Sequence, residues 1–156
     1  MLPDHALKYE LRCMTDAYTE DLFVSTKNKY EAVVFPVSRL VVDPERFVDD
    51  KKEKMSKKGM GVIYSLTSDG KNLRRNITDQ EREFLINKYY HSHHQKLNDT
   101  VENHLKKYGK SFIVDCHSFP SVPLPYESNQ SKDRPDICIG TDNFHKIGRA
   151  SCRERV

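Results

Sequence analysis

The sequence predicts an α/β fold with a mixed, mostly parallel sheet that is flanked by helices. Two observations support this prediction. Segments with the pattern of strands alternate along the chain with segments of helical periodicity. The strand-like runs are short and rich in β-branched and aromatic residues, and they end in charged or turn-forming residues. Such alternation is typical of a single layered domain.

The N-terminal third begins with a predicted short helix over residues 15–23, for which Thr15 or Asp16 is a suitable N-cap. A β-branched run, residues 31–42, follows and is interrupted at Pro36. Residues 39–50 mix arginine, aspartate and proline, which is typical of a loop beside the end of a strand.

The middle of the chain contains the clearest helical pattern. The charged residues 49–61 are expected to be solvated, and residues 62–70 predict a strand that enters a turn at Asp69-Gly70. A helix is predicted over residues 78–108. Thr78 and Glu81 form a capping box at its start, and Gly109 provides the stop. A helix of about 45 Å must cross the whole domain or kink near residues 91–94.

Two further buried strands are predicted, over residues 110–116 and 134–142. The first ends in Asp115 and His117, which point to the same side of an extended chain. Ligands of open α/β sheets bind where strands end, so this pair predicts a metal site or an acid/base pair. Alternatively, Asp115 caps a turn and His117 bonds to backbone groups. The second strand is flanked by Asp136, Asp142 and His145.

Two other groups of polar residues have both structural and functional interpretations. His91, His93 and His94 lie in the predicted helix without the H-E-x-x-H pattern, which favours a solvated or partly packed patch over a zincin site. Arg39 and Arg46 flank an apolar run that ends at Asp43. They are either ion-paired scaffolding or a clamp for a substrate carboxylate.

Composition excludes several classes of function. The 156 residues suffice for one domain, and the formal net charge of +3 leaves no basic face for nucleic acid. No apolar run is long enough to cross a membrane, and the N-terminus lacks the apolar segment of a signal peptide, so the expected location is the cytoplasm. The four cysteines form no C-x-x-C pair, and neither a P-loop nor a G-x-G-x-x-G motif is present.

Five segments, taken together, resemble the N-formylglutamate amidohydrolase family. They are TDAYTEDLF, SRLVVDPERF, GMGVIY, DCHSFPS and PDICIGTDNFH, in the order of that family. The resemblance implies a fold like that of the zinc-dependent exopeptidases, with a phosphorylase/hydrolase-like mixed sheet. It also implies hydrolysis of N-formyl-L-glutamate, a small-molecule N-acyl amino acid, to glutamate and formate, a late step of histidine breakdown.

The resemblance also implies roles for particular residues. His117 and Asp16 would be ligands of a zinc ion, and Asp115 is the candidate catalytic carboxylate beside them. Arg46 would hold the α-carboxylate of the substrate, with help from Arg39. Related enzymes often have Asn-Arg where this chain has Glu45 before Arg46.

The family pattern extends beyond the chain at both ends. A Pro-His-Ser-Gly segment with another histidine ligand is expected upstream, and a general-base glutamate is expected downstream. Residues 1–146 are therefore predicted to be a partial domain and residues 147–156 a non-native tail. With one histidine and one carboxylate, the chain is expected to be inactive on N-formylglutamate.

Two other functions fit the same residues. One is a catalytically dead α/β domain that binds an acidic small molecule or a protein partner. The other is a related deformylase or deacylase whose substrate is a different acyl-amino acid.

Overall fold

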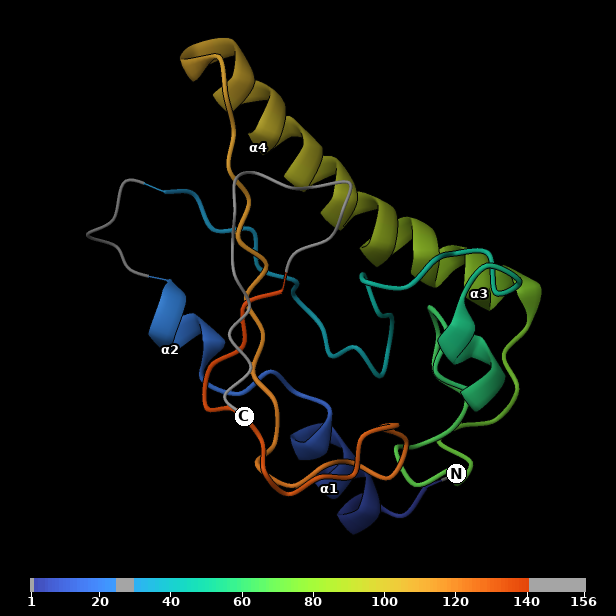
Figure 1. The fold of residues 1–156 in the computed structure, drawn as a ribbon. Coiled ribbons are helices and arrows are strands. Elements are labelled where there is room, and N and C mark those ends of the chain that lie inside the picture. Colours follow the sequence, from blue (N-terminus) through green and yellow to red (C-terminus); the bar gives the residue numbers. More distant parts are fainter. Residues whose placement is uncertain (1, 25–29, 141–156) are drawn as a thin grey trace.

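The computed structural model describes residues 2–24 and 30–140 of the chain. Helices are the regular elements of this part (Figure 1). In chain order they are α1 (Asp4–Cys13), α2 (Thr19–Phe23), the 3₁₀-helix η1 (Lys54–Lys58), α3 (Asp79–Leu85), the π-helical η2 (Ile86–His91) and α4 (Ser92–Tyr108).

The longest element joins α3, η2 and α4 without a break, which confirms the predicted helix. Thr78 caps it through the predicted capping box: the Thr78 side chain accepts from the amide of Glu81, whose side chain accepts from the amide of Thr78. Gly109 ends it in the left-handed conformation, at φ 71°. The π-helical segment in the middle was not predicted from the sequence.

The two N-terminal helices differ from expectation. Helix α1 was not predicted, and α2 begins at Thr19 rather than at residue 15. The side chain of Asp16 does not cap α2, because it bonds to Arg39 and to the amide of Ser118 instead. The helix therefore starts later than local chemistry predicts, and Asp16 makes tertiary contacts instead of capping it.

The predicted mixed, mostly parallel sheet is wrong, and residues 2–24 and 30–140 do not form the exopeptidase-like layers either. The described residues form two isolated antiparallel bridges, Met60 with Tyr64 and Leu66 with Asn72, and no sheet. Residues 112–114 are extended, but their side chains are 70%, 56% and 64% exposed. β-Branched residues favour an extended backbone, yet they do not supply the neighbouring strand that a sheet requires.

Two clusters of buried apolar side chains form the core. One contains Met14, Leu40, Met60, Tyr64, Leu73 and Leu124, and the other contains Val42, Val62 and Ile86. Residues 40–43 and 60–64 contribute to both clusters. The amide of Asp43 donates to the carbonyl of Val62 at 2.8 Å, which ties these two segments together.

A buried carboxylate anchors α1 to the predicted turn at Asp69-Gly70. Glu10 accepts hydrogen bonds from the amide of Ser68 at 2.6 Å and from its hydroxyl at 2.9 Å. The turn is closed by the amide of Gly70, which donates to the carbonyl of Thr67 at 2.9 Å. The end of α1 is thereby fixed, and Asp16 follows directly after it.

After Gly109 the chain returns in an extended course from the end of α4 toward α1 (Figure 1). The amide of Ser118 meets Asp16 on this return, and Leu124 enters the core beside Met14. Residues 115–118 are thus brought to the loop between α1 and α2. No helix in residues 2–24 or 30–140 has the length and apolar character that crossing a bilayer requires.

Two glycines, Gly59 and Gly109, allow a matched test of how closely Leu66 packs against residue 59. Gly59 and Gly109 share a left-handed backbone, at φ 70° and 71°, so alanine strains both by a similar amount, about 1–2 kcal/mol. A Cβ at Gly59 would also lie 2.8 Å from Leu66 Cβ, whereas nothing lies within 4 Å at Gly109. We expect Gly59→Ala to lower the free energy of unfolding in urea by about 1–3 kcal/mol more than Gly109→Ala. Equal losses would contradict this packing.

Candidate metal centre

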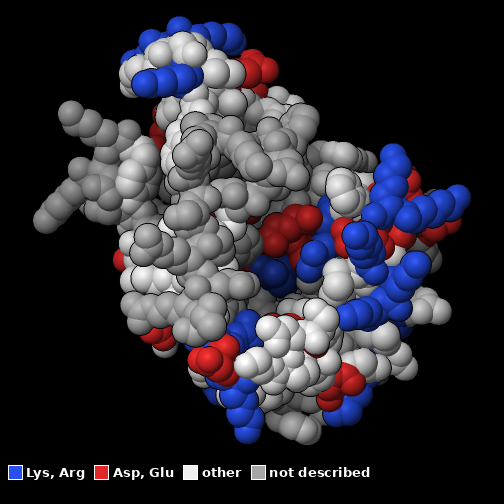
Figure 2. Space-filling view, in the orientation of Figure 1, with Lys and Arg blue, Asp and Glu red and all other residues white. Residues whose placement is uncertain are grey.

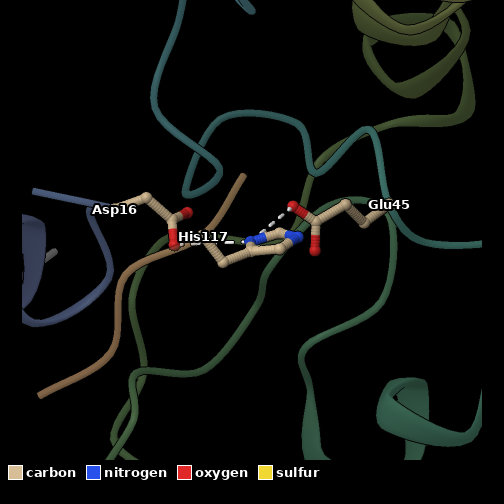
Figure 3. A group of neighbouring side chains, drawn as sticks. All are labelled: Asp16, Glu45 and His117. Atoms are coloured by element: carbon tan, nitrogen blue, oxygen red, sulfur yellow. Dashed lines mark ion pairs between the residues drawn. The ribbon is translucent and has the colours of Figure 1, made fainter. Parts of the chain in front are cut away.

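Three side chains from distant parts of the sequence meet at one point: Asp16, Glu45 and His117 (Figure 3). Asp16 lies in the loop between α1 and α2, Glu45 lies in the loop that follows the buried Val42 and Asp43, and His117 lies on the returning segment. One potential ligand atom from each lies within 4.8 Å of the others.

The imidazole of His117 lies between the two carboxylates. Its Nδ1 is 3.4 Å from Asp16 Oδ1 and 3.6 Å from Glu45 Oε1. Its Nε2 faces the other way and lies 3.3 Å from Asp115 Oδ2. Since 40% of the side chain is exposed, the ring is open to solvent rather than packed in the core.

Arg39 also contacts both carboxylates. Its guanidinium bonds to Asp16 Oδ2 and lies 3.4 Å from Glu45 Oε1. Asp16 Oδ1 also accepts the amide of Ser118 at 3.0 Å. Both oxygens of Asp16 therefore have donors, and the carboxylate is held in one orientation.

The buried Asp43 holds Glu45 in place. Asp43 Oδ1 accepts the amide of Glu45 at 3.0 Å, and Asp43 Oδ2 accepts the hydroxyl of Tyr64 at 2.7 Å. Both Asp43 and Tyr64 are fully buried. The loop that carries Glu45 is thus anchored from inside the core.

These contacts shift the pKa values of the clustered groups. Hydrogen bonds with Asp115 and Asp16 raise the pKa of His117 to about 10, against the effect of its burial. Burial favours a higher pKa for Asp16, but the hydrogen bond with His117 and the charge of Arg39 outweigh it and lower that pKa. The hydrogen bond with His117 lowers the pKa of Asp115, and burial raises the pKa of Glu45.

The structure brings together four of the five residues that the sequence singled out: His117, Asp16, Asp115 and Arg39. Arg46 instead pairs with Asp43, whose Oδ2 lies 3.4 Å from Arg46 Nε. Arg46 is still the direct neighbour in sequence of a residue in the cluster.

Sequence reasoning missed Glu45 as a member of the site. The available signal was a carboxylate in place of the usual asparagine, directly before the predicted substrate arginine. The predicted cluster of His91, His93 and His94 is partly packed: the ring of His93 meets Phe35 edge-on. Asp142 and His145, and the predicted tail from residue 147, lie outside the described residues.

The donor set fits a divalent cation. One imidazole nitrogen and two carboxylate oxygens are ligands that zinc accepts, and zinc sites in enzymes commonly have three protein ligands. On the face drawn in Figure 2, acidic and basic side chains meet in a hollow, whereas other lysines and arginines gather at the outer edge on the side of α3.

A comparison with models of protein families gave a match to N-formylglutamate amidohydrolase over residues 3–156. The chain belongs to the N-formylglutamate amidohydrolase family. The comparisons with curated proteins and with solved structures gave no match.

Membership of the N-formylglutamate amidohydrolase family confirms the resemblance seen in the sequence, and it identifies the chain as one of a family of hydrolases that act on N-formylglutamate. The substrates of this family are small molecules. The matched range contains every residue of the cluster around His117.

The raised pKa of His117 predicts how the protein's stability depends on pH. A group that binds its proton more tightly when folded stabilises the folded state below its unfolded pKa, near 6.5, and this stabilisation is lost as the pH rises toward about 10. We expect His117→Gln to lower the free energy of unfolding at pH 6, by an amount that shrinks steadily to pH 10. Urea unfolding at several pH values measures this difference. A pH-independent difference would show that His117 is not held protonated by Asp115 and Asp16.

Proposed function

We propose that the chain carries the metal-binding part of an amidohydrolase centre for N-formyl-L-glutamate, or for a similar N-acyl amino acid, a reaction whose products are formate and glutamate. The observation that carries the proposal is the position of His117 Nδ1 between Asp16 and Glu45 in a chain of this family. Chemistry on an amide requires activation of water, which a carboxylate-rich site without a cation supplies poorly.

Asp16, Glu45 and His117 are the proposed ligands of the metal. When bound there, zinc would lower the pKa of water toward about 7 and polarise the formyl oxygen. Asp115 bonds to His117 Nε2, which leaves Nδ1 directed toward the two carboxylates. We therefore assign to Asp115 the orientation of the histidine ligand, a role that carboxylates often play beside metal-bound histidines.

The two predicted substrate arginines have different surroundings. The guanidinium of Arg39 is engaged by Asp16 and Glu45 and so belongs to the ligand cluster. Arg46 Nε lies 3.4 Å from Oδ2 of the buried Asp43. With Nε directed to that carboxylate, the two terminal nitrogens of the guanidinium can face the carboxylate of a substrate. Arg46 is therefore the proposed anchor for the α-carboxylate of the substrate.

The prediction that this chain does not release formate is kept as part of the proposal. It was based on one histidine and one carboxylate as ligands. The group among the described residues contains one histidine, His117, and a second carboxylate, Glu45, in addition to Asp16. The alternative of a dead domain that binds an acidic ligand has no requirement for a metal, so metal binding is the property that separates the two.

Titration with zinc tests the proposed centre. We expect one zinc ion to bind reversibly, with release by a chelator, and His117→Ala to abolish binding. Because the ligand must lose the proton that it holds below about pH 10, affinity should rise by about tenfold per pH unit between pH 6 and 8. His5→Ala, on the exposed side of α1, is the control and should bind as the unaltered chain does. Binding that survives in His117→Ala would favour the alternative.

Binding of N-formyl-L-glutamate to the zinc-loaded chain tests the substrate anchor. We expect Arg46→Lys to weaken binding by at least about tenfold, since a lysine cannot make two parallel hydrogen bonds to a carboxylate. The exposed Arg12 on α1 provides the matched control, and Arg12→Lys should leave the dissociation constant unchanged. Calorimetry gives both values, and equal affinities would remove Arg46 from the proposed site.

A further inference from the structure

His94 connects the long helix to the loop that carries Glu45. Its Nε2 lies 2.9 Å from the carbonyl oxygen of Pro44, 50 residues earlier in the sequence. A carbonyl oxygen only accepts hydrogen bonds, so Nε2 carries the hydrogen in this contact. The ring itself is held by Tyr90, with the two ring centroids 4.3 Å apart.

The hydrogen bond from His94 acts on the same peptide unit that Asp43 holds. The carbonyl of Pro44 and the amide of Glu45 belong to one planar group. His94 donates to its oxygen, and its N–H donates to Asp43 Oδ1 at 3.0 Å. With both ends bonded, the plane cannot rotate, and the direction in which the side chain leaves Glu45 is restricted.

We propose that His94 is a positioning residue for the metal centre, one that fixes the Pro44–Glu45 peptide so that Glu45 faces His117 and Asp16. The proposal rests on the metal-binding function proposed above. Neither Asp43 nor His94 suffices alone, because a planar group held at one end can still swing about that contact. His94 acts through Glu45, and no direct contact with the metal is assigned to it.

The favoured position of Glu45 needs such support. Its carboxylate oxygen lies 3.4 Å from Arg39 and 3.6 Å from His117 Nδ1, so it has two competing partners. A small rotation of the backbone at Glu45 would shorten one of these two contacts and break the other. Residues that orient metal ligands typically change metal affinity by 10–100-fold when they are replaced.

Three variants, two at His94 in α4 and one at His91 at the end of η2, test the proposal by zinc affinity. We expect His94→Phe, which keeps the ring packing but cannot donate, to weaken zinc binding by about tenfold or more. His94→Gln should stay within about threefold, because its amide nitrogen can reach the same carbonyl. His91→Phe, an exposed position whose ring also contacts Tyr90, is the control and should have no effect.

A double-mutant cycle with Glu45→Gln separates positioning from a general loss of stability. If His94 acts through Glu45, His94→Phe should weaken zinc binding little further in the Glu45→Gln background. Full additivity of the two losses would overturn the proposal, as would a His94→Gln variant as weak as His94→Phe.

Hydrogen exchange in the metal-free protein gives a readout that does not need zinc. We expect the amide hydrogen of Glu45 to exchange about tenfold faster in His94→Phe than in the unaltered chain, and His94→Gln to restore slow exchange. Unchanged exchange in His94→Phe would overturn the positioning role. If the unaltered chain binds no zinc, the proposed function fails, and the exchange rates still decide the role of His94.

Discussion

The buried carboxylate of Asp43 is the constraint on which the arrangement of the site depends. A charge without exposure to water must be satisfied within the protein. Asp43 accepts hydrogen bonds from Tyr64 and from the amide of Glu45, and it forms an ion pair with Arg46. These three partners of Asp43 belong to different parts of the molecule. Tyr64 belongs to the core, Glu45 to the ligand cluster, and Arg46 to the proposed substrate anchor. The cost of burying Asp43 therefore enforces the relative positions of all three.

The charges around His117 nearly balance without a metal. Three carboxylates, from Asp16, Glu45 and Asp115, face the guanidinium of Arg39 and a protonated imidazole. The formal charges of these five side chains add up to −1. A dication that binds in exchange for the proton on His117 changes this net charge by one unit, to 0. The cluster is thus arranged so that the metal-free form is folded and held together by ion pairs, while the metal-bound form is closer to neutral.

Local signals in the sequence were reliable where local chemistry decides the structure. The capping box at Thr78 and the glycine stop at Gly109 were found because each requires only neighbouring residues. The sheet failed because pairing depends on distant partners, and residues 112–114 read as a buried strand but lie exposed. His117 and Asp16 could be proposed from family motifs. For Glu45 the sequence offered only a carboxylate in place of the usual asparagine, and this did not place the residue in the site, because its position depends on the tertiary contacts of the loop.

The π-helical segment Ile86–His91 determines how far α4 is rotated about the helix axis relative to α3. A π-helical turn contains one residue more than an α-helical turn, and one residue corresponds to about 100° of rotation around an α-helix. A chain that lost a single residue there and became a regular α-helix would turn α4 by that angle relative to α3. The imidazole at position 94 would then face away from the loop at Pro44. The local underwinding of this helix thus determines which residues of α4 face the carboxylate cluster.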